Sequence, residues 1–302
     1  MRPALVLTEY VPSTPVGLSV TERDALRSLV PGLTIEPVAG STDTYTITGG
    51  SSVGVVPVGD LTVELRPKVG IAPVLFLLSY ALDPKAWREP HAELVRDMNL
   101  AEAIVPLFAR AVQAALRPGL LHGYRTREDT LATVRGRVRM ADQMRARTGL
   151  AMPVEVVYDE FTPNILENRL LRTAVDVLGR LRLRHQTSRR ALARLHQQLN
   201  GIGNLIVGNR EVPEPVWTRL NERYRPAVSL ARLIVTTAGL EAQAGGEDAS
   251  AFVVDMNDVF ERFVQAALRE QLRLDTKAFP AASRGHPVYL DTGRLVGSVS
   301  LR

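Results

Sequence analysis

Residues 163–183, PNILENRLLRTAVDVLGRLRL, carry the pattern that decides the fold class of the middle of this chain. Apolar residues recur there at the spacing of one helical face, namely Ile165, Leu166, Leu170, Leu171, Ala174, Val175 and Leu178. Such spacing predicts an amphipathic helix that buries one face against other elements. Two further helices are expected at 187–199 and 229–237, so we predict a helical middle region.

Upstream, the first seventy residues favour strands. Short β-type runs alternate with Gly, Ser, Pro and Asp, which is typical of strands joined by turns. One helix is expected at 21–29, with Ser19 or Thr21 as its cap. The pattern then becomes helical, and Pro106 is expected to kink or break the second of these helices. The predicted strands are 4–8, 33–37, 44–48, 53–58, 61–65 and 153–158, the helices 71–82 and 94–116, and the extended chain 120–140.

Downstream, a helix is expected at 255–274 with Asp255 as its N-cap, followed by short strands at 286–290 and 294–301. The whole pattern predicts an α+β protein. We divide it into a β-rich amino-terminal domain over 1–150, a helical connecting region over 151–250 and a third part over 251–302.

Composition supports a globular protein: 45% of the 302 residues are hydrophobic and 23% are charged. The chain has no cysteine, which excludes disulfides and thiolate metal sites. Its five histidines lack the spacing of metal ligands. No apolar run has the length of a signal sequence or a membrane span, so a cytoplasmic protein without membrane contact is expected.

Two loop motifs suggest chemistry but fit it poorly. The run 49–54, GGSSVG, lacks the Lys-Ser/Thr ending of a phosphate-binding loop. It also matches Gly-x-Ser-x-Gly formally, but a strand-like run follows Ser52 where a nucleophile elbow needs a helix. An ordinary turn is the favoured interpretation.

Acidic residues provide no complete metal site. Asp159 and Glu160 could hold a metal, although helix capping or ion pairing is favoured. Glu261 is a candidate accessory acid for a nuclease; the alternative is an i,i+4 surface pair. The triplet Asp275-Thr276-Lys277 ends a predicted helix, so we reject it as catalytic. The sequence therefore predicts no complete catalytic site, and no metal is expected in this chain.

The clearest electrostatic feature is a basic run without acids between Asp176 and Glu211. Only three of the 37 basic residues in the chain are lysines, and arginine suits phosphate recognition. Two interpretations of this run remain open: it binds DNA phosphates or a protein partner, or it is a solvated helix face. Arg180 and Arg184 are expected to share a helical face, as are Arg190 and Arg194. The candidate DNA- or partner-binding residues are Arg180, Arg184, Arg189, Arg190 and Arg194.

Five segments together resemble the McrC family, in order and across most of the chain. They are LRPKVG (65–70) with LFLLSYAL (75–82), GLLHGY (119–124) with LATVRGRV (131–138), YDEFT (158–162) with NRLL (168–171), RLNERY (219–224) with LAR (230–232), and FVVDMNDVFE (252–261). One position departs from the pattern: Asn164 stands near the place where the family often has an aspartate.

This resemblance implies a subunit of a 5-methylcytosine-dependent restriction system used in phage defence. Such proteins pair with McrB, a hexameric AAA+ GTPase; their amino-terminal part inserts into the ring and stimulates GTP hydrolysis. Their carboxy-terminal part is a Mg-dependent PD-(D/E)xK endonuclease acting on methylated double-stranded DNA. By this resemblance 251–302 begins that nuclease fold, and the chain is expected to stop before its catalytic motif and to lack nuclease activity alone.

A different class of function competes with this expectation. The chain could be a stand-alone DNA-binding or adaptor protein that uses the arginine-rich helix. Ring binding and steeply salt-dependent DNA binding are the observations that distinguish the two hypotheses.

Overall fold

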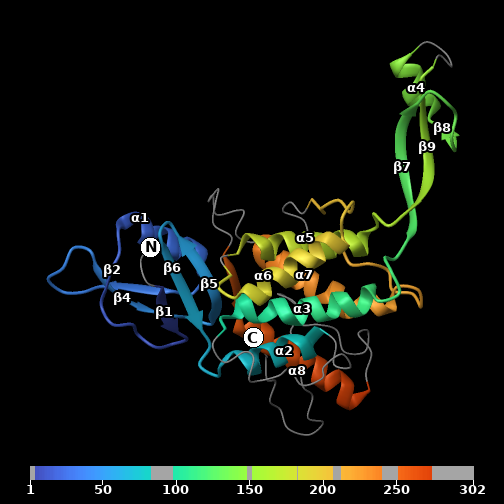
Figure 1. Ribbon diagram of the computed structural model, residues 1–302. Coiled ribbons are helices and arrows are strands. Elements are labelled where there is room, and N and C mark those ends of the chain that lie inside the picture. Colours follow the sequence, from blue (N-terminus) through green and yellow to red (C-terminus); the bar gives the residue numbers. More distant parts are fainter. Residues whose placement is uncertain are drawn as a thin grey trace, which may run out of the picture.

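The computed structural model describes residues 4–82, 98–147, 152–181, 183–206, 212–239 and 251–273. Two small sheets occupy one end of the body, a helical layer follows, and a long arm projects from the far end of that layer (Figure 1). This arrangement confirms the predicted α+β class.

The amino-terminal sheets contain the five strands predicted before residue 67. The first sheet has the order β1-β6-β5-β10, with β1 parallel to β6 and the other pairs antiparallel. The second has the order β2-β4-β3. Helix α1 (Val20–Leu29) packs beside them, and Ser19 and Glu22 form a reciprocal capping box at its start. The strand bounds are β1 Leu5–Thr8, β2 Val16–Gly17, β3 Thr34–Pro37, β4 Thr44–Thr48, β5 Ser52–Val58, β6 Leu61–Arg66 and β10 Phe252–Asp255.

A large hydrophobic core lies between the helices and the first sheet. Pro106 does not break α3, because core residues on both sides of it, such as Val105 and Phe108, are fully buried and hold the two halves in one helix. Residues 94–97, the start of the helix predicted over 94–116, lie outside the described residues. The helix bounds are α2 Ile71–Leu82, α3 Leu100–Leu116, α5 Leu166–Arg180, α6 Gln186–Gln198, α7 Arg225–Gly239 and α8 Met256–Leu272, with a short 3-10 turn η2 at Glu222–Tyr224.

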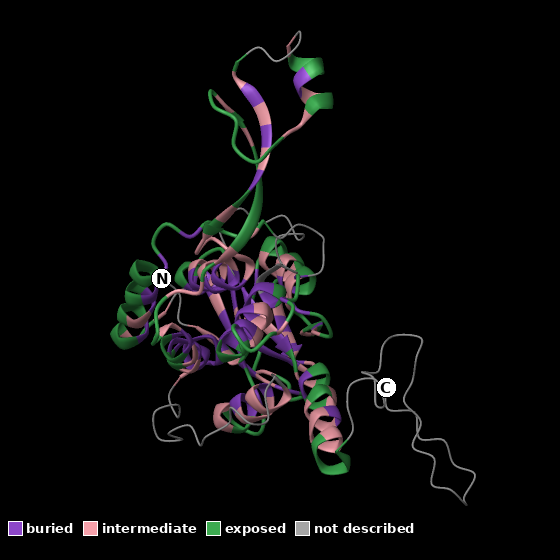
Figure 2. Ribbon diagram, turned by 90° about the vertical axis from the view of Figure 1, so that its right-hand side faces the viewer, coloured by how far each residue is buried: buried purple, intermediate pink, exposed green. Residues whose placement is uncertain are grey.

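The arm is an antiparallel ladder of β7 (Gly123–Leu131) and β9 (Val154–Thr162), paired from Gly123↔Thr162 to Leu131↔Val154. Its tip carries β8 (Arg137–Val138) and helix α4 (Met140–Ala146), which the sequence analysis missed. Figure 2 shows the arm standing clear of the body, with buried residues along one side of the ladder. A small core of its own stabilises the tip: Val154, Val156 and Tyr158, with Leu131 and Val138 against them.

Strand β10 was not predicted, and it brings the later chain back to the first sheet. Phe252 pairs with Val55 and is fully buried. Helix α8 starts directly after β10, capped by Asp255 as predicted, and packs against α2. The β7–β9 pairing thus crosses the predicted boundary at residue 150, and the β5–β10 pairing crosses the one at residue 250. The division into three parts remains a prediction. Residues 240–250 and both strands expected from residue 286 onward lie outside the described residues.

In the part of the chain that the structure describes, no helix has the length and apolarity to cross a membrane.

Gly54 provides a test of the β5–β10 pairing. Its φ is +153°, and a Cβ at this position would clash with the Phe252 carbonyl oxygen. We expect Gly54→Ala to lower the free energy of unfolding by about 3 kcal/mol, because neither backbone can move without losing the pairing. Chemical denaturation measures this change.

Gly59→Ala is the matched control. Gly59 also has a positive φ, +56°, but a Cβ there meets open space. We expect this variant to cost about 1 kcal/mol from backbone strain alone. Equal losses in the two variants would contradict the proposed role of close approach.

Candidate partner and nucleic-acid interface

The predicted basic residues lie where α5 ends and α6 begins. Arg180 is the last residue of α5, whose C-cap Leu181 is extended, so Arg184 falls in the connection between helices. The prediction that Arg180 and Arg184 share a helical face is therefore wrong. Arg190 and Arg194 do lie one turn apart on α6. All five predicted arginines are exposed: Arg180, Arg184, Arg189, Arg190 and Arg194.

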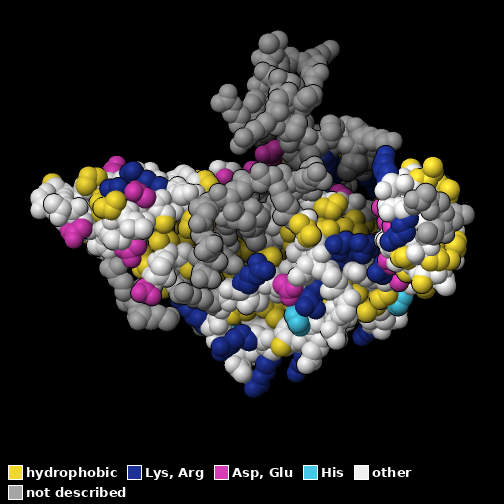
Figure 3. Space-filling model, turned by 90° about the horizontal axis from the view of Figure 1, so that it is seen from above, with side chains coloured by type: hydrophobic (Ala, Val, Ile, Leu, Met, Phe, Trp, Pro, Cys, Tyr) yellow, Lys and Arg dark blue, Asp and Glu magenta, His cyan; other side chains and the backbone are white. Residues whose placement is uncertain are grey.

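Their contacts divide these arginines into two groups. The Arg184 guanidinium lies 3.9 Å from a carboxylate oxygen of the buried Glu64, and Arg189 donates to the Arg184 carbonyl. Among the described residues, Arg180, Arg190 and Arg194 have no ion pair. Figure 3 shows arginine and lysine side chains along the helical part of the molecule, seen from above. The unpaired group can accept an external anion without first losing a protein partner.

A buried carboxylate fixes the α5–α6 connection to α3. Glu102 is 1% exposed, and its Oε1 accepts hydrogen bonds from the backbone N–H groups of Arg184 and His185. Its Oε2 lies 2.9 Å from His185 Nδ1. Since a buried carboxylate needs several partners to offset its desolvation, this cluster holds the basic connection in one place.

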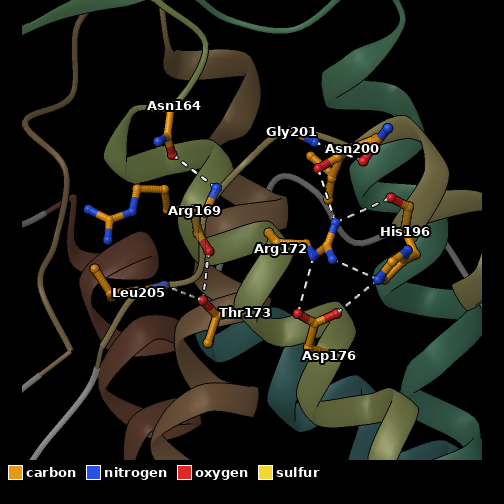
Figure 4. Close-up of polar contacts among 11 residues, drawn as sticks. Asn164, Arg169, Arg172, Thr173, Asp176, His196, Asn200, Gly201 and Leu205 are labelled. Carbon is orange, nitrogen blue, oxygen red and sulfur yellow. Dashed lines mark hydrogen bonds and ion pairs between the residues drawn. The ribbon is translucent and has the colours of Figure 1, made fainter.

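A second cluster fixes α6 against α5 (Figure 4). Arg172 Nε donates to Asp176 Oδ2 at 3.1 Å, an i,i+4 pair on α5. The same guanidinium donates to the carbonyls of His196 and Leu199 and lies 2.7 Å from His196 Nε2. These contacts occupy the Arg172 guanidinium within the protein, so Arg172 has a structural role. In the sequence, the i,i+4 spacing of Arg172 and Asp176 was the one signal of this ion pair.

The arm carries the acidic pair that the sequence analysis placed before a helix. Both residues lie inside β9, not at a helix start. Asp159 accepts from Thr126 Oγ1 at 2.7 Å, and Glu160 pairs with Arg127 at 3.5 Å. These contacts join β9 to β7, so the capping interpretation is wrong and the ion-pair interpretation is confirmed for Glu160.

The arm tip exposes apolar side chains to solvent. Figure 3 looks down onto the tip, where hydrophobic side chains gather around its rim. Near the tip the Arg135 guanidinium stacks over the Tyr158 ring at 4.1 Å, and Gly136 packs against Tyr158 too closely for any Cβ. The exposed apolar residues are Val134, Met140, Met144 and Met152. Flexible methionines on a projecting surface are typical of a protein-binding site.

Glu261 does not belong to a metal site in the described part of the chain. It is half-buried on α8 and accepts from Gln265 Nε2 at 3.1 Å, one helical turn away. Among the described residues, no group of His, Cys, Asp or Glu could hold a metal ion. The 275–277 triplet lies outside these residues. Ser52 is buried at the start of β5 and donates to the Pro31 carbonyl, which supports the turn interpretation of GGSSVG.

A family model described as McrBC 5-methylcytosine restriction system component matches residues 47–288. The chain belongs to this family. The match confirms the resemblance to McrC proteins that the five motifs indicated. None of the curated proteins matches the chain.

Two solved structures share the family fold. A chain in the cryo-EM structure of the Thermococcus gammatolerans McrBC complex is 22% identical over 89% of this chain and 88% of that one, with a TM-score of 0.55. A chain in the refined half-complex from the tetradecameric assembly of Thermococcus gammatolerans McrB AAA+ hexamers with bound McrC is 23% identical over 89% and 71%, with a TM-score of 0.53. At 22% and 23% sequence identity, these two matches show only that the chains share a fold.

The Glu102 cluster provides a stability test. We expect Glu102→Ala to lower the free energy of unfolding by about 3 kcal/mol, because two backbone donors and a histidine lose a buried acceptor. Thermal and chemical denaturation measure the loss. Glu36→Ala, at an exposed position of β3, serves as the control and should change stability by less than about 0.5 kcal/mol. A Glu102 variant as stable as this control would contradict the assigned role.

Proposed function

We propose that this chain is the McrC-type subunit of a modification-dependent restriction system and that it binds and stimulates an McrB-type AAA+ GTPase ring through the arm. The family match supports this partner, and so does the similar structure of McrB AAA+ hexamers with bound McrC. The observation that carries the assignment to the arm is its projection from the body with an exposed apolar tip.

The dimensions and internal bonding of the arm suit insertion into a ring. Nine paired residues at about 3.4 Å each give a ladder of roughly 30 Å. A two-stranded ribbon is marginally stable alone, but this one has a tip core and cross-strand pairs. The tip therefore keeps its shape away from the body and presents a preorganised surface to a partner, which lowers the entropy lost on binding.

The charges at the tip are mostly satisfied within it. Arg139 pairs with Glu128 and Asp142, and Arg147 pairs with Glu155. The exposed methionines of the tip are therefore the side chains left to contact a partner. We therefore assign the main contact with the ring to apolar burial, which scales with the area removed from water.

In its full-length form a McrC-type protein also supplies a Mg-dependent endonuclease. The described residues offer no carboxylate group that fits Mg²⁺, and Glu261 is engaged by Gln265. The proposed nuclease role therefore rests on the family resemblance alone.

The double variant Met140→Asp/Met144→Asp tests ring binding by the arm. Met140 is the first residue of α4 and Met144 is 70% exposed, so the substitutions leave the fold intact. We expect the stimulation of GTP hydrolysis by a cognate McrB ring to fall at least about tenfold, because charges replace two apolar side chains that would be buried against the ring. Steady-state GTPase assays with increasing subunit concentration measure this.

Val20→Asp is the matched control, since Val20 is also exposed and also the first residue of a helix, at the far end of the molecule. It should stimulate like the wild type. Normal stimulation by the Met140/Met144 variant would show that the arm tip is not the ring-binding surface. Failure of the wild-type chain to bind the ring would reject the proposed partner.

DNA binding through the basic residues is a second candidate function, favoured by the exposed arginines without ion pairs. We expect the wild-type chain to bind double-stranded DNA with a strong salt dependence. Arg190→Glu/Arg194→Glu should weaken binding and make the log–log salt slope shallower by about 2, one unit for each lost phosphate contact. Fluorescence anisotropy over a salt series measures both.

Arg184 is left unchanged in this test because it lies beside Glu64, and a charge reversal there would also perturb the fold. Arg110→Glu, on the exposed side of α3, is the control for charge alone. Equal effects of Arg110 and Arg190/Arg194 substitutions would assign binding to net charge and reject a defined DNA surface.

A further inference from the structure

A cavity of about 450 Å³ lies at the root of the arm. Three segments line this open cavity: the start of β7 with the residues before it (121–125), the start of α5 (164–169) and the turn 218–221 before η2. The volume is within the range of small-ligand sites. Neither the basic residues of α6 nor the arm tip contributes to it.

The charged residues of this cavity leave an excess of positive charge. Arg125 and Arg169 both line it, and Glu167 is the acid among the lining residues. Glu167 is buried, and its Oε1 accepts from Asn221 Nδ2 at 2.9 Å. Within the described residues, Arg125 and Arg169 have no ion pair, so two guanidinium groups share the cavity with one carboxylate that already has a partner.

The Arg169 guanidinium has bonding capacity that the protein leaves unused. Its Nη2 donates to the Asn204 carbonyl at 2.8 Å, but its Nε is buried and has no hydrogen-bond partner. Burial and then the nearby Arg125 lower the pKa of Arg169 from its usual value. Figure 4 shows this side chain pointing away from the Arg172–Asp176–His196 cluster. The two guanidinium groups are close enough for Arg125 to affect the pKa of Arg169, and such a pair of cations favours an anionic ligand.

The start of α5 adds to this preference. Its N-cap, Ile165, has no side chain that could accept a hydrogen bond from the first turn. Ile165, Leu166 and Glu167 all line the cavity. The N-terminal end of α5 thus lies at the same cavity as the two arginines, with Glu167 in its first turn offsetting part of the positive charge there.

Exposed rings border the cavity on the side of the arm. His122 and Tyr124 line it, and both contact the ring of Phe161, with centroids 5.4 Å and 5.2 Å away. Tyr124 is 77% exposed, as is Leu220 on the side of the 218–221 turn. An aromatic rim next to paired guanidinium groups is the combination that binds a base and its phosphate.

We propose that the cavity binds a nucleotide, with its phosphate held by Arg125 and Arg169 and its base against the rim of His122, Tyr124 and Leu220. A single carboxylate of a protein partner would satisfy the charge but would leave the aromatic rim and most of the 450 Å³ unused. The nucleotide is a free mononucleotide or one unit of single-stranded DNA; the two share this chemistry. The inference is independent of ring binding, because it concerns the chain alone.

The test uses the full chain without any partner. GTP, a short oligo-dT labelled with a fluorophore, and inorganic phosphate are titrated separately, followed by anisotropy for the oligonucleotide and by calorimetry for the others. We expect Arg125→Gln and Arg169→Gln each to weaken nucleotide binding by about tenfold, since each removes a charged hydrogen bond. Tyr124→Ala should weaken binding of the nucleotides but not of inorganic phosphate.

Arg137→Gln, an exposed arginine of the same arm outside the cavity, is the matched control and should bind like the wild type. GTP binding assigns the site to free nucleotides, and binding of oligo-dT alone assigns it to single-stranded DNA. Absence of binding to all three probes, or equal losses in Arg125 and Arg137 variants, would overturn the proposal. If Arg169→Gln lowers thermal stability, the exposed Arg125 decides the outcome by itself.

Discussion

The pairing of β10 with β5 is the constraint on which the rest of this structure depends. It adds residues from near position 250 to a sheet made by the first seventy, and it buries Phe252 completely in the core shared with the helices. The close approach at Gly54 permits this pairing because no side chain stands between the two backbones. Strand β10 also brings α7 and α8 into contact with this sheet, while α3 contacts β5 directly.

Buried polar groups then determine where the functional surfaces lie. Asn168 Nδ2 donates to the carbonyls of Leu121, two residues before β7, and Pro163, the residue after β9. The Leu121 N–H donates to the hydroxyl of the fully buried Tyr224. The arm therefore starts from a fixed root, and its tip is preorganised in space by the bonds of the body and not only by its own ladder.

The spacing of apolar residues predicted most helices and strands of the body, because it shows which side of each element is buried. The stripe from Ile165 to Leu178 became α5, and the alternating runs before residue 67 became strands at nearly the predicted bounds. Strand β10 was missed because FVVD is only four residues long and precedes a strong helix pattern; its partner lies about two hundred residues away. Helix α4 was missed because seven residues with a single buried side chain carry no stripe.

The candidate sites were less predictable, for a related reason. Charge along the sequence identified the arginines at 180–194 as a group. Only the fold shows that Glu64 and Arg184 are neighbours, and that Arg190 and Arg194 have no ion pair among the described residues. The cavity joins three segments separated by about forty to fifty residues each, and no local pattern connects them. A lone Tyr124 or Arg169 resembles any other surface residue until its neighbours are known.

The root of the arm links the two proposals physically. The residues that fix the arm and those that line the cavity belong to the same two segments, 121–125 and 164–169. A ligand that bridges Arg125 on β7 and Arg169 on α5 would join the arm to the body at one further point and so favour its present orientation. By linkage, a partner that holds the tip in this orientation would raise the affinity of the cavity for that ligand by the same factor. Coupling between the tip and the root of the arm therefore needs no large conformational change. It needs only that the ring at the tip and the ligand at the root both bind best at the same orientation of the β7–β9 ladder relative to the body.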